Sequence, residues 1–402
     1  MNDFKIGINL WSQATSWTDL LDAAQAADRL GFEHLWTWDH LKAIFGDPHQ
    51  PIFEGWTAIT ALAMATSRVR IGLMVGANTF RNPGLVAKIV TTLDHVSGGR
   101  AILGIGGAWF ELEHREFGIE FGRSPGERLD WLDESVGTIR SLVSGDKVTS
   151  PAGGHYDFSD LTINPLPVQK RLPILIGGNG RTKTLRTLAK YGDLWNAFGL
   201  PAEVKELDGV LRRHCEELGR DEREIERSIN LWVVIRDSEA EARREWAAAM
   251  ELNRTPVERA IEPSRPVFGT PETIADRLIE YYEAGFTTAI VEVPAPYDRE
   301  TLERLAREVR PLVARRPASA LLGSLRTYEG TDHHPEHGDG NDHDRQHGQR
   351  DLVPQALPGG PAPRCPTLAR IPGRNQVPAH GDTERHEGQD HEREREDAEP
   401  VG

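Results

Sequence analysis

The sequence predicts an α/β protein in which eight parallel strands, each followed by a helix, close into a (β/α)8 TIM barrel. Residues 70–109 read as an apolar strand, a helix and a second apolar strand, and such a βαβ unit makes its two strands parallel. The same alternation runs from residue 4 to residue 313. All ten Trp, all twelve Phe and all four Met lie before residue 315, so the core ends there. An open doubly wound sheet is the alternative, but such a sheet rarely has eight regular βα units.

Each expected strand is a short apolar or alternating run, and each expected helix has apolar residues three or four positions apart. Glycines mark helix ends, as at Gly31 and at Ser97-Gly98-Gly99, because glycine accepts a left-handed backbone. In chain order, the strands are expected at residues 4–10, 33–38, 70–75, 101–105, 173–176, 194–198, 228–235 and 287–293. The helices are expected at residues 17–30, 55–65, 84–96, 124–143, 181–191, 202–218 and 299–313, with helices on either side of residues 263–268.

The regular alternation is interrupted after Trp109. A helix over residues 124–143 is followed by residues 147–167, where the turn Pro151-Ala152-Gly153-Gly154 separates two short extended pieces. This pattern is typical of a hairpin. The barrel is therefore expected to carry an insertion after its fourth strand.

The composition changes at about residue 315. Residues 316–402 contain no Trp, Phe or Met, and they are rich in Gly, Pro, His and charged residues. Such a segment buries too little apolar surface to offset the entropy of ordering. We therefore expect residues 1–315 to form the barrel domain and residues 316–402 a low-complexity, disordered tail. Eight of the fifteen His lie in this tail. A His-rich tract can bind metal, but no ligand spacing repeats, so a solvated extension is the preferred interpretation.

The overall composition excludes several classes of function. A net charge of −15 argues against binding to nucleic acid or to a membrane surface, because both favour clustered Lys and Arg. No run of 18 apolar residues and no signal-peptide pattern is present, which favours a cytoplasmic protein. The two cysteines, Cys215 and Cys365, suggest neither a disulfide framework nor a metal cluster. The expected partner is a small-molecule substrate, and a homodimer is a candidate assembly.

Candidate site residues follow from the barrel itself, because ligands bind at the carboxyl ends of its strands. No set of acids and histidines has the spacing of a metal cage, so no metal site is expected. The residues at these ends are Asp39 and His40, Gly76 to Thr79, Gly106, Gly107 and Trp109, Gly177 to Gly180, Asn196 and Phe198, and Glu292.

The turn Gly177-Gly178-Asn179-Gly180 suggests a phosphate site. Glycines between a strand and a helix let backbone N–H groups point at a phosphate, and the helix N-terminus adds a partial positive charge. Arg181 would open that helix and add a direct contact. The motif is short, and a tight βα turn without a ligand is an equally open interpretation.

His40 and its neighbours suggest proton transfer. A histidine titrates near neutral pH, and one beside an acid at a strand end can move protons. A purely structural histidine is the alternative, and Asp39 could equally cap the following segment. His95 and His114 are interpreted as structural residues on the surface of a helix or loop. Trp36, Trp38, Trp56 and Trp109 could form an aromatic wall against a ring system, although each could also belong to the core.

Several blocks of the sequence resemble the bacterial luciferase-like superfamily. They are IGINLW near the N-terminus, WTWDHL at 36–41, IGLMVGANTFRNPGLVAK at 71–88, LDHVSGGRAILGIGGAW at 93–109 and PILIGGNGRTKTLRTLAKYGDLWN at 173–196. The nearest branch is that of the deazaflavin (coenzyme F420)-dependent oxidoreductases, with flavin-dependent monooxygenases as close cousins. The resemblance covers most of residues 4–313 and nothing after about residue 315.

This resemblance implies a TIM barrel with an insertion after strand four and a cofactor over the strand ends. It implies a non-prolyl cis peptide at Met74-Val75 against the cofactor ring, with Asn78, Gly106 and Gly107 close by. It also implies phosphate contacts at Gly177, Gly178, Asn179 and Gly180. The pair Asp39-His40 matches the acid and histidine that sugar-phosphate dehydrogenases of this branch use. Those dehydrogenases carry a glutamate where this chain has Trp109, so their substrate is not carried over. Trp38 and Trp109 instead suggest a more apolar or aromatic substrate.

Three functions remain open at this point. In the first, coenzyme F420 exchanges a hydride with a small organic substrate, His40 moves the proton and Asp39 orients His40. In the second, FMN and oxygen serve a monooxygenase on the same fold. In the third, the barrel binds a flavin without catalysis, although storage would not need Asp39, His40 or a polar loop after strand three.

Overall fold

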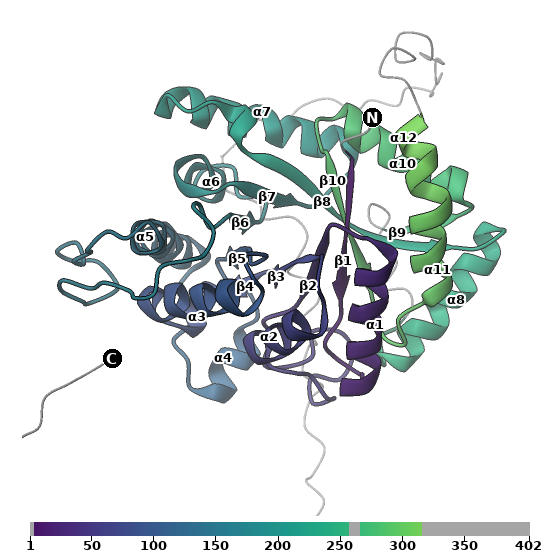
Figure 1. Ribbon diagram of the computed structural model, residues 1–402, viewed down its shortest axis with the longest axis horizontal. Helices are drawn as coiled ribbons and strands as arrows, with labels where there is room; N and C mark the ends of the chain where they lie inside the picture. Colours follow the sequence, from purple (N-terminus) through teal and green to yellow (C-terminus); the bar gives the residue numbers. More distant parts are fainter. Residues whose placement is uncertain (1–3, 257–265, 316–402) are drawn as a thin grey trace, which may run out of the picture. The chain divides into compact units, whose positions relative to one another are not determined.

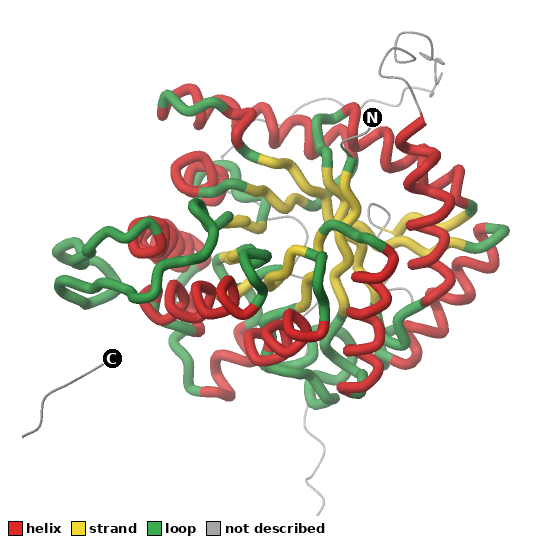
Figure 2. The backbone as a smooth tube through the Cα atoms, in the orientation of Figure 1, coloured by secondary structure: helices red, strands yellow, loops and turns green. Residues whose placement is uncertain are grey.

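The computed structural model describes residues 4–256 and 266–315, and in them ten strands form one parallel sheet. Helices surround these strands, as Figures 1 and 2 show. The strands are β1 (Lys5–Leu10), β2 (His34–Thr37), β3 (Arg70–Leu73), β4 (Gly76–Ala77), β5 (Leu103–Gly106), β6 (Ile174–Gly177), β7 (Leu194–Ala197), β8 (Glu226–Ile235), β9 (Pro266–Gly269) and β10 (Thr288–Val293). Their order around the sheet is β3-β2-β1-β10-β8-β7-β6-β5-β4, with β9 paired to β8 outside this path.

The sheet closes because β3 and β4 are two parts of one barrel strand. β3 pairs with β2, and β4 pairs with β5. The N–H of Ile71 in β3 also donates to Arg100 O (2.9 Å), and the N–H of Ile102 donates to Ile71 O (2.9 Å). These bonds join the two ends of the strand order, so the predicted TIM-type barrel is confirmed.

The helices pack their apolar faces on the outside of the sheet. The principal ones are α1 (Trp17–Leu30), α2 (Gly55–Ala65), α3 (Pro83–Val96), α4 (Glu111–Phe117), α5 (Pro125–Val143), α6 (Thr184–Tyr191), α7 (Pro201–Leu218), α8 (Glu239–Leu252), α10 (Pro271–Glu283), α11 (Arg299–Arg304) and α12 (Arg310–Arg315). Between α11 and α12 lies a π-helical turn, η3 (Leu305–Val309). A short 3-10 turn, η1 (Asn78–Phe80), follows β4, and another, η2 (Glu222–Glu224), precedes β8.

The predicted insertion after the fourth strand is present between β5 and β6. It contains α4, α5 and a hairpin-like loop whose two sides meet at the antiparallel bridge between Val148 and Leu161. Helix α4 and strand β9 were missed, and the sequence placed β9 in a linker between two helices. Helix α6 begins at Thr184 rather than at Arg181, so the expected helix start was wrong.

The predictions on the C-terminal tail and on membrane and metal binding are tested only in part by this structure. The tail of residues 316–402, with its His-rich tract, lies outside the described residues. Within the described ranges, no helix is long and apolar enough to cross a membrane, and no group of three or more His, Cys, Asp or Glu could hold a metal ion.

Candidate active site

Parallel pairing brings most of the predicted strand-end residues to one edge of the barrel. Asn196 at the end of β7 lies beside Gly177 of β6, and Gly106 at the end of β5 lies beside Ala77 of β4. The residues after β2 and β5 also meet, because the rings of His40 and Trp109 lie 5.6 Å apart. This edge therefore holds the candidate site.

His40 is held by a carboxylate from the insertion. Its Nδ1 lies 3.0 and 3.2 Å from the two carboxylate oxygens of Glu113, a residue of α4. The same carboxylate accepts the backbone N–H of Leu41 at 2.9 Å. Glu113 is 1% exposed, whereas the side chain of His40 is 15% exposed. The imidazole thus has one buried ionic partner and one side that reaches solvent.

The prediction that Asp39 orients His40 is wrong. The Asp39 carboxylate accepts hydrogen bonds from the Arg81 guanidinium (2.7 and 3.1 Å) and from the N–H of Ala77 (3.0 Å). Arg81 also contacts Glu54, the N-cap of α2. Burial raises the pKa of Asp39, and the neighbouring Arg81 opposes that rise. Asp39 therefore ties β4 to the end of β2 and does not touch the imidazole through any of these contacts.

The peptide bond Met74-Val75 is cis, as the resemblance implies, and it separates β3 from β4. The Val75 side chain lies against glycines of β5 and β6. A Cβ on Gly106 would come within 2.8 Å of Val75 Cγ2, and a Cβ on Gly177 within 3.1 Å of Val75 Cγ1. These glycines are needed to make room for Val75, a role that the sequence did not reveal. Gly107 has another neighbour, because a Cβ there would meet Leu129 at 2.8 Å.

The turn after β6 is held by the side chain of Asn179, and several of its backbone N–H groups have no acceptor among the described residues. Asn179 donates from Nδ2 to Phe198 O (2.6 Å) and accepts the N–H of Phe198 (3.2 Å), which joins the loops after β6 and β7. Gly178 has φ +126°, a conformation that favours glycine. Among the described residues, no acceptor is found for the N–H groups of Asn179, Gly180 and Arg181. Helix α6 begins at Thr184, so Arg181 does not open it. Arg181 instead pairs with Glu206 at an exposed position.

Asn78, which follows β4, and His114 of α4 are both buried polar residues. Asn78 donates to the Tyr156 hydroxyl (3.2 Å), and its buried Oδ1 has no partner in the part of the chain that the structure describes. Burial raises the pKa of Tyr156 to about 12. His114 is fully buried, so its predicted surface position is wrong. Its Nδ1 donates to Phe110 O (2.8 Å), which leaves Nε2 to accept from the Thr79 hydroxyl (2.6 Å). His95 is exposed, as predicted.

The four candidate tryptophans divide into two groups. Trp36 lies inside the barrel and Trp56 in the outer core, so neither contributes to a wall at the strand ends. Trp38 and Trp109 flank His40, with ring centroids 6.3 and 5.6 Å from the imidazole, and Phe110 lies 6.2 Å from it. Trp38 also packs against Trp11 (4.8 Å) in a separate buried aromatic cluster.

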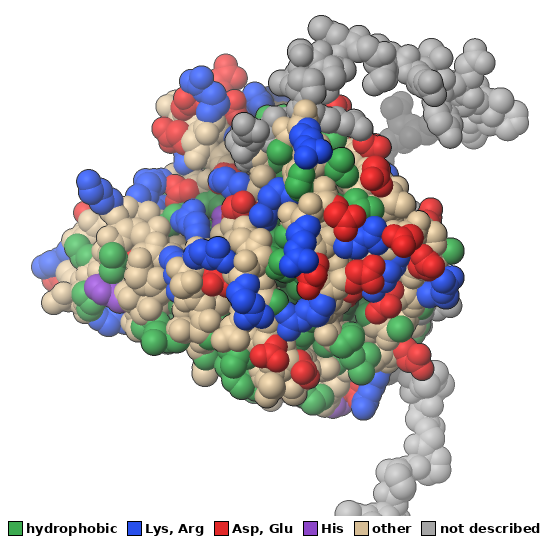
Figure 3. All heavy atoms as spheres, turned by 45° about the vertical axis from the view of Figure 1, so that its right-hand side comes forward, with side chains coloured by type: hydrophobic (Ala, Val, Ile, Leu, Met, Phe, Trp, Pro, Cys, Tyr) green, Lys and Arg blue, Asp and Glu red, His purple; other side chains and the backbone are tan. Residues whose placement is uncertain are grey.

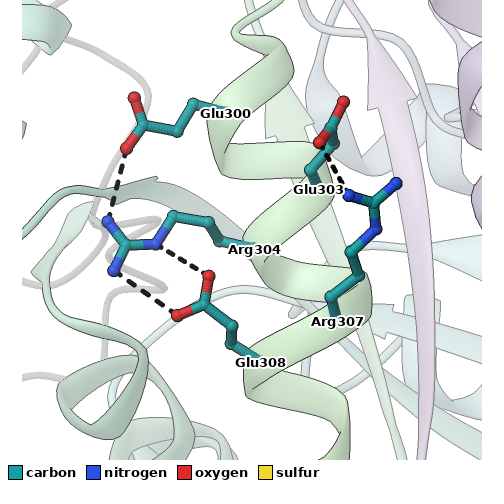
Figure 4. A pocket seen from close by; sticks show the side chains of 5 residues that line it. All are labelled: Glu300, Glu303, Arg304, Arg307 and Glu308. Atoms are coloured by element: carbon teal, nitrogen blue, oxygen red, sulfur yellow. Dashed lines mark hydrogen bonds and ion pairs between the residues drawn. The ribbon is translucent and has the colours of Figure 1, made fainter.

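A surface pocket on α11 and η3 is unrelated to this edge. Its five lining side chains are all charged, and Figure 4 shows them joined in ion pairs one helical turn apart. The face of the molecule in Figure 3 likewise intersperses acidic and basic side chains. Such exposed pairs contribute little to stability and offer no unpaired charge to a ligand.

The profile of the family described as luciferase-like monooxygenase matches residues 4–288. The chain belongs to this family. It is therefore a luciferase-like oxidoreductase, and its relatives use more than one chemistry.

Relatives of this luciferase-like chain include two F420-dependent glucose-6-phosphate dehydrogenases. The one from Microbacterium testaceum is 29% identical over 345 residues, which covers 78% of this chain and 98% of the relative. The one from Kineococcus radiotolerans is 30% identical over 340 residues, covering 77% and 97%. A 4-hydroxyprotoasukamycin monooxygenase from Streptomyces nodosus subsp. asukaensis is 25% identical over 351 residues, covering 80% and 91%.

Solved structures show the same fold. An F420-dependent secondary alcohol dehydrogenase in complex with an F420-acetone adduct matches with a TM-score of 0.67 at 22% identity, covering 77% of this chain and 99% of the other. An FMN complex of the oxygenating constituent of 3,6-diketocamphane monooxygenase from Pseudomonas putida matches with a TM-score of 0.60 at 17% identity, covering 77% and 98%.

Proposed function

We propose that this luciferase-like oxidoreductase transfers a hydride between a deazaflavin of the coenzyme F420 type and a small organic substrate. The observation that carries the proposal is His40, a histidine at the strand ends whose Nδ1 is bound to a buried carboxylate while its side chain stays partly exposed. The names of the two dehydrogenase relatives support F420, because both match over nearly their whole length.

The described residues fit such a cofactor. Val75 and the glycines beside it form an uncharged surface for a flat ring, and the buried Oδ1 of Asn78 is an acceptor that no described residue bonds. The N–H groups of Asn179, Gly180 and Arg181 could hold a phosphate, since none of the described residues supplies an acceptor for them. When bound, the deazaflavin would supply the carbon that gives or takes the hydride.

The chain's own residues would manage the proton. Hydride transfer to or from a carbon that bears oxygen or nitrogen requires a proton to move at that atom, and a positioned imidazole can exchange it. His40 would be this donor or acceptor. Trp38, Trp109 and Phe110 would exclude water around the imidazole and favour a substrate with apolar or aromatic character.

A cofactor-binding experiment tests the proposal against its main alternative. The monooxygenase relative and the name of the family favour FMN as the second candidate. The full chain, produced in a host that makes F420, should retain F420 by absorbance and mass, and the apoprotein should bind F420 more tightly than FMN. Retention of FMN with no measurable affinity for F420 would contradict the proposal and favour the monooxygenase.

A further inference from the structure

Two carboxylates on α4 hold three consecutive residues that follow β2. Glu113 contacts His40 and the N–H of Leu41, and Glu116 pairs with Lys42. Glu113 and Glu116 are three residues apart, so they lie on neighbouring positions of one helix face. Helix α4 therefore supports the segment that carries the candidate proton-transfer residue.

The two contacts differ in their surroundings. Glu113 is 1% exposed, and a buried carboxylate that accepts charge-assisted hydrogen bonds is a strong partner. The Glu116 and Lys42 side chains are 34% and 17% exposed, and partly exposed ion pairs of this kind contribute much less. Both carboxylates contact the same segment, but of the two only Glu113 contacts the imidazole.

The Glu113 contact selects one tautomer of His40. An ionised carboxylate can only accept hydrogen bonds, so Nδ1 must carry the hydrogen. Nε2 is then the nitrogen that can take a proton, and among the described residues no hydrogen-bonding partner is found for it. Three aromatic rings, those of Trp38, Trp109 and Phe110, lie with their planes at 73° to 85° to the imidazole.

We propose that Glu113 is the positioning residue of this site, which fixes the Nδ1–H tautomer of His40 and stabilises the positive charge when Nε2 takes up a proton. The proposal rests on the proposed function for its role in turnover. The tautomer itself is a property of the protein without cofactor or substrate.

The neighbouring charges do not replace Glu113. Asp39 and Lys42 lie beside His40 in the sequence, but Asp39 is paired with Arg81, and Lys42 with Glu116. Glu111 and His114 also belong to α4: Glu111 is exposed, and burial lowers the pKa of His114, which favours its neutral form. Glu113 is thus the carboxylate in direct contact with the imidazole.

The decisive variant is Glu113→Gln, with Glu116→Gln as its matched control on the same helix and the same segment. A glutamine can donate to Nδ1 as well as accept from it, so the tautomer is no longer fixed. In the apoprotein, ¹⁵N NMR of the imidazole should show Nδ1–H in the wild type and in Glu116→Gln. Glu113→Gln should show both tautomers, because its amide no longer requires a hydrogen on Nδ1.

Turnover gives the second readout. With F420 bound, Glu113→Gln should lower kcat by about 10- to 1,000-fold, leave the Kd for F420 nearly unchanged, and add nothing to the loss in a His40→Ala background. Glu113→Asp keeps the charge and should recover part of the rate. If Glu113→Gln does not fold, the wild-type NMR spectrum still decides, because an Nε2–H tautomer would overturn the proposal. Equal losses in Glu113→Gln and Glu116→Gln, or additive losses with His40→Ala, would also overturn it. If the protein does not use F420, turnover fails while the NMR result stands, so the two failures are distinguishable.

Discussion

Asp39 and His40 are adjacent in the sequence but serve different parts of the structure. The Asp39 carboxylate is 2% exposed and ties Arg81 and the N–H of Ala77 together, whereas the His40 side chain turns to Glu113. Both residues lie beyond the end of β2 (His34–Thr37), and their side chains meet different elements there. At the residue scale, then, the carboxylate that contacts a candidate base need not belong to the residue next to that base in the sequence.

His40 is expected to affect turnover far more than cofactor binding. His40→Ala should leave the Kd for F420 nearly intact and lower kcat by roughly 10²–10⁴-fold, the usual contribution of a positioned acid or base. His40→Asn keeps a hydrogen bond without the proton and should be about as slow as the alanine variant. Steady-state kinetics checks both, and an asparagine variant with near wild-type kcat would show that His40 only positions the substrate.

His34 is expected to make stability depend on pH. Burial lowers its pKa from 6.5 to about 4, opposed by the nearby Glu226 carboxylate. The unfolded chain therefore binds a proton that the folded chain does not, and stability falls as the pH drops from about 6.5 towards about 4. The loss from this residue should be on the order of 2 kcal/mol between about pH 7 and pH 5. Urea unfolding at both pH values measures the difference in the free energy of unfolding. This difference should shrink in His34→Gln, and an equal difference in the variant would assign the effect to other groups.

At the scale of elements, the turn after β6 depends on a clamp between two loops. Asn179 joins this turn to Phe198 through two hydrogen bonds, which holds its free N–H groups in place. Asn179→Ala should therefore weaken binding of F420 by about tenfold, whereas a cofactor fragment without its phosphate should bind almost as before. Fluorescence titration with both ligands measures this contrast. Equal weakening for both would mean that the turn is only structural.

The elements that could be predicted from the sequence are those in which apolar residues recur at regular positions. The barrel strands are short apolar or alternating runs, and the glycine turns after them follow from backbone geometry. Helix α4 (ELEHREF) has no apolar period, and β9 (PVFG) is too short and too rich in Pro and Gly to be recognised. Glu113 could not be found for the same reason: it lies in a charged stretch, 73 residues from His40, and only the fold shows that it is buried.

At the scale of the whole molecule, the barrel is complete before the tail begins. β10 pairs with both β1 and β8, and the last helical segment packs four buried aliphatic side chains against the barrel, Leu302, Leu305, Val309 and Val313. Each such side chain contributes about 1.5–3 kcal/mol by its burial. The composition after residue 315 offers no comparable apolar surface. The stability of the barrel should therefore depend on residues up to 315 and not on those that follow.

Two truncations test this boundary. A chain that ends at residue 315 should keep the melting temperature of the full chain and its affinity for F420, because it retains every core side chain of the described residues. A chain that ends at residue 298 should unfold or melt far lower, because it loses the four aliphatic side chains of α11, η3 and α12. Calorimetry of the three proteins measures both effects. A clear drop in melting temperature at the first truncation would show that residues after 315 pack on the barrel, and the composition argument would then be wrong.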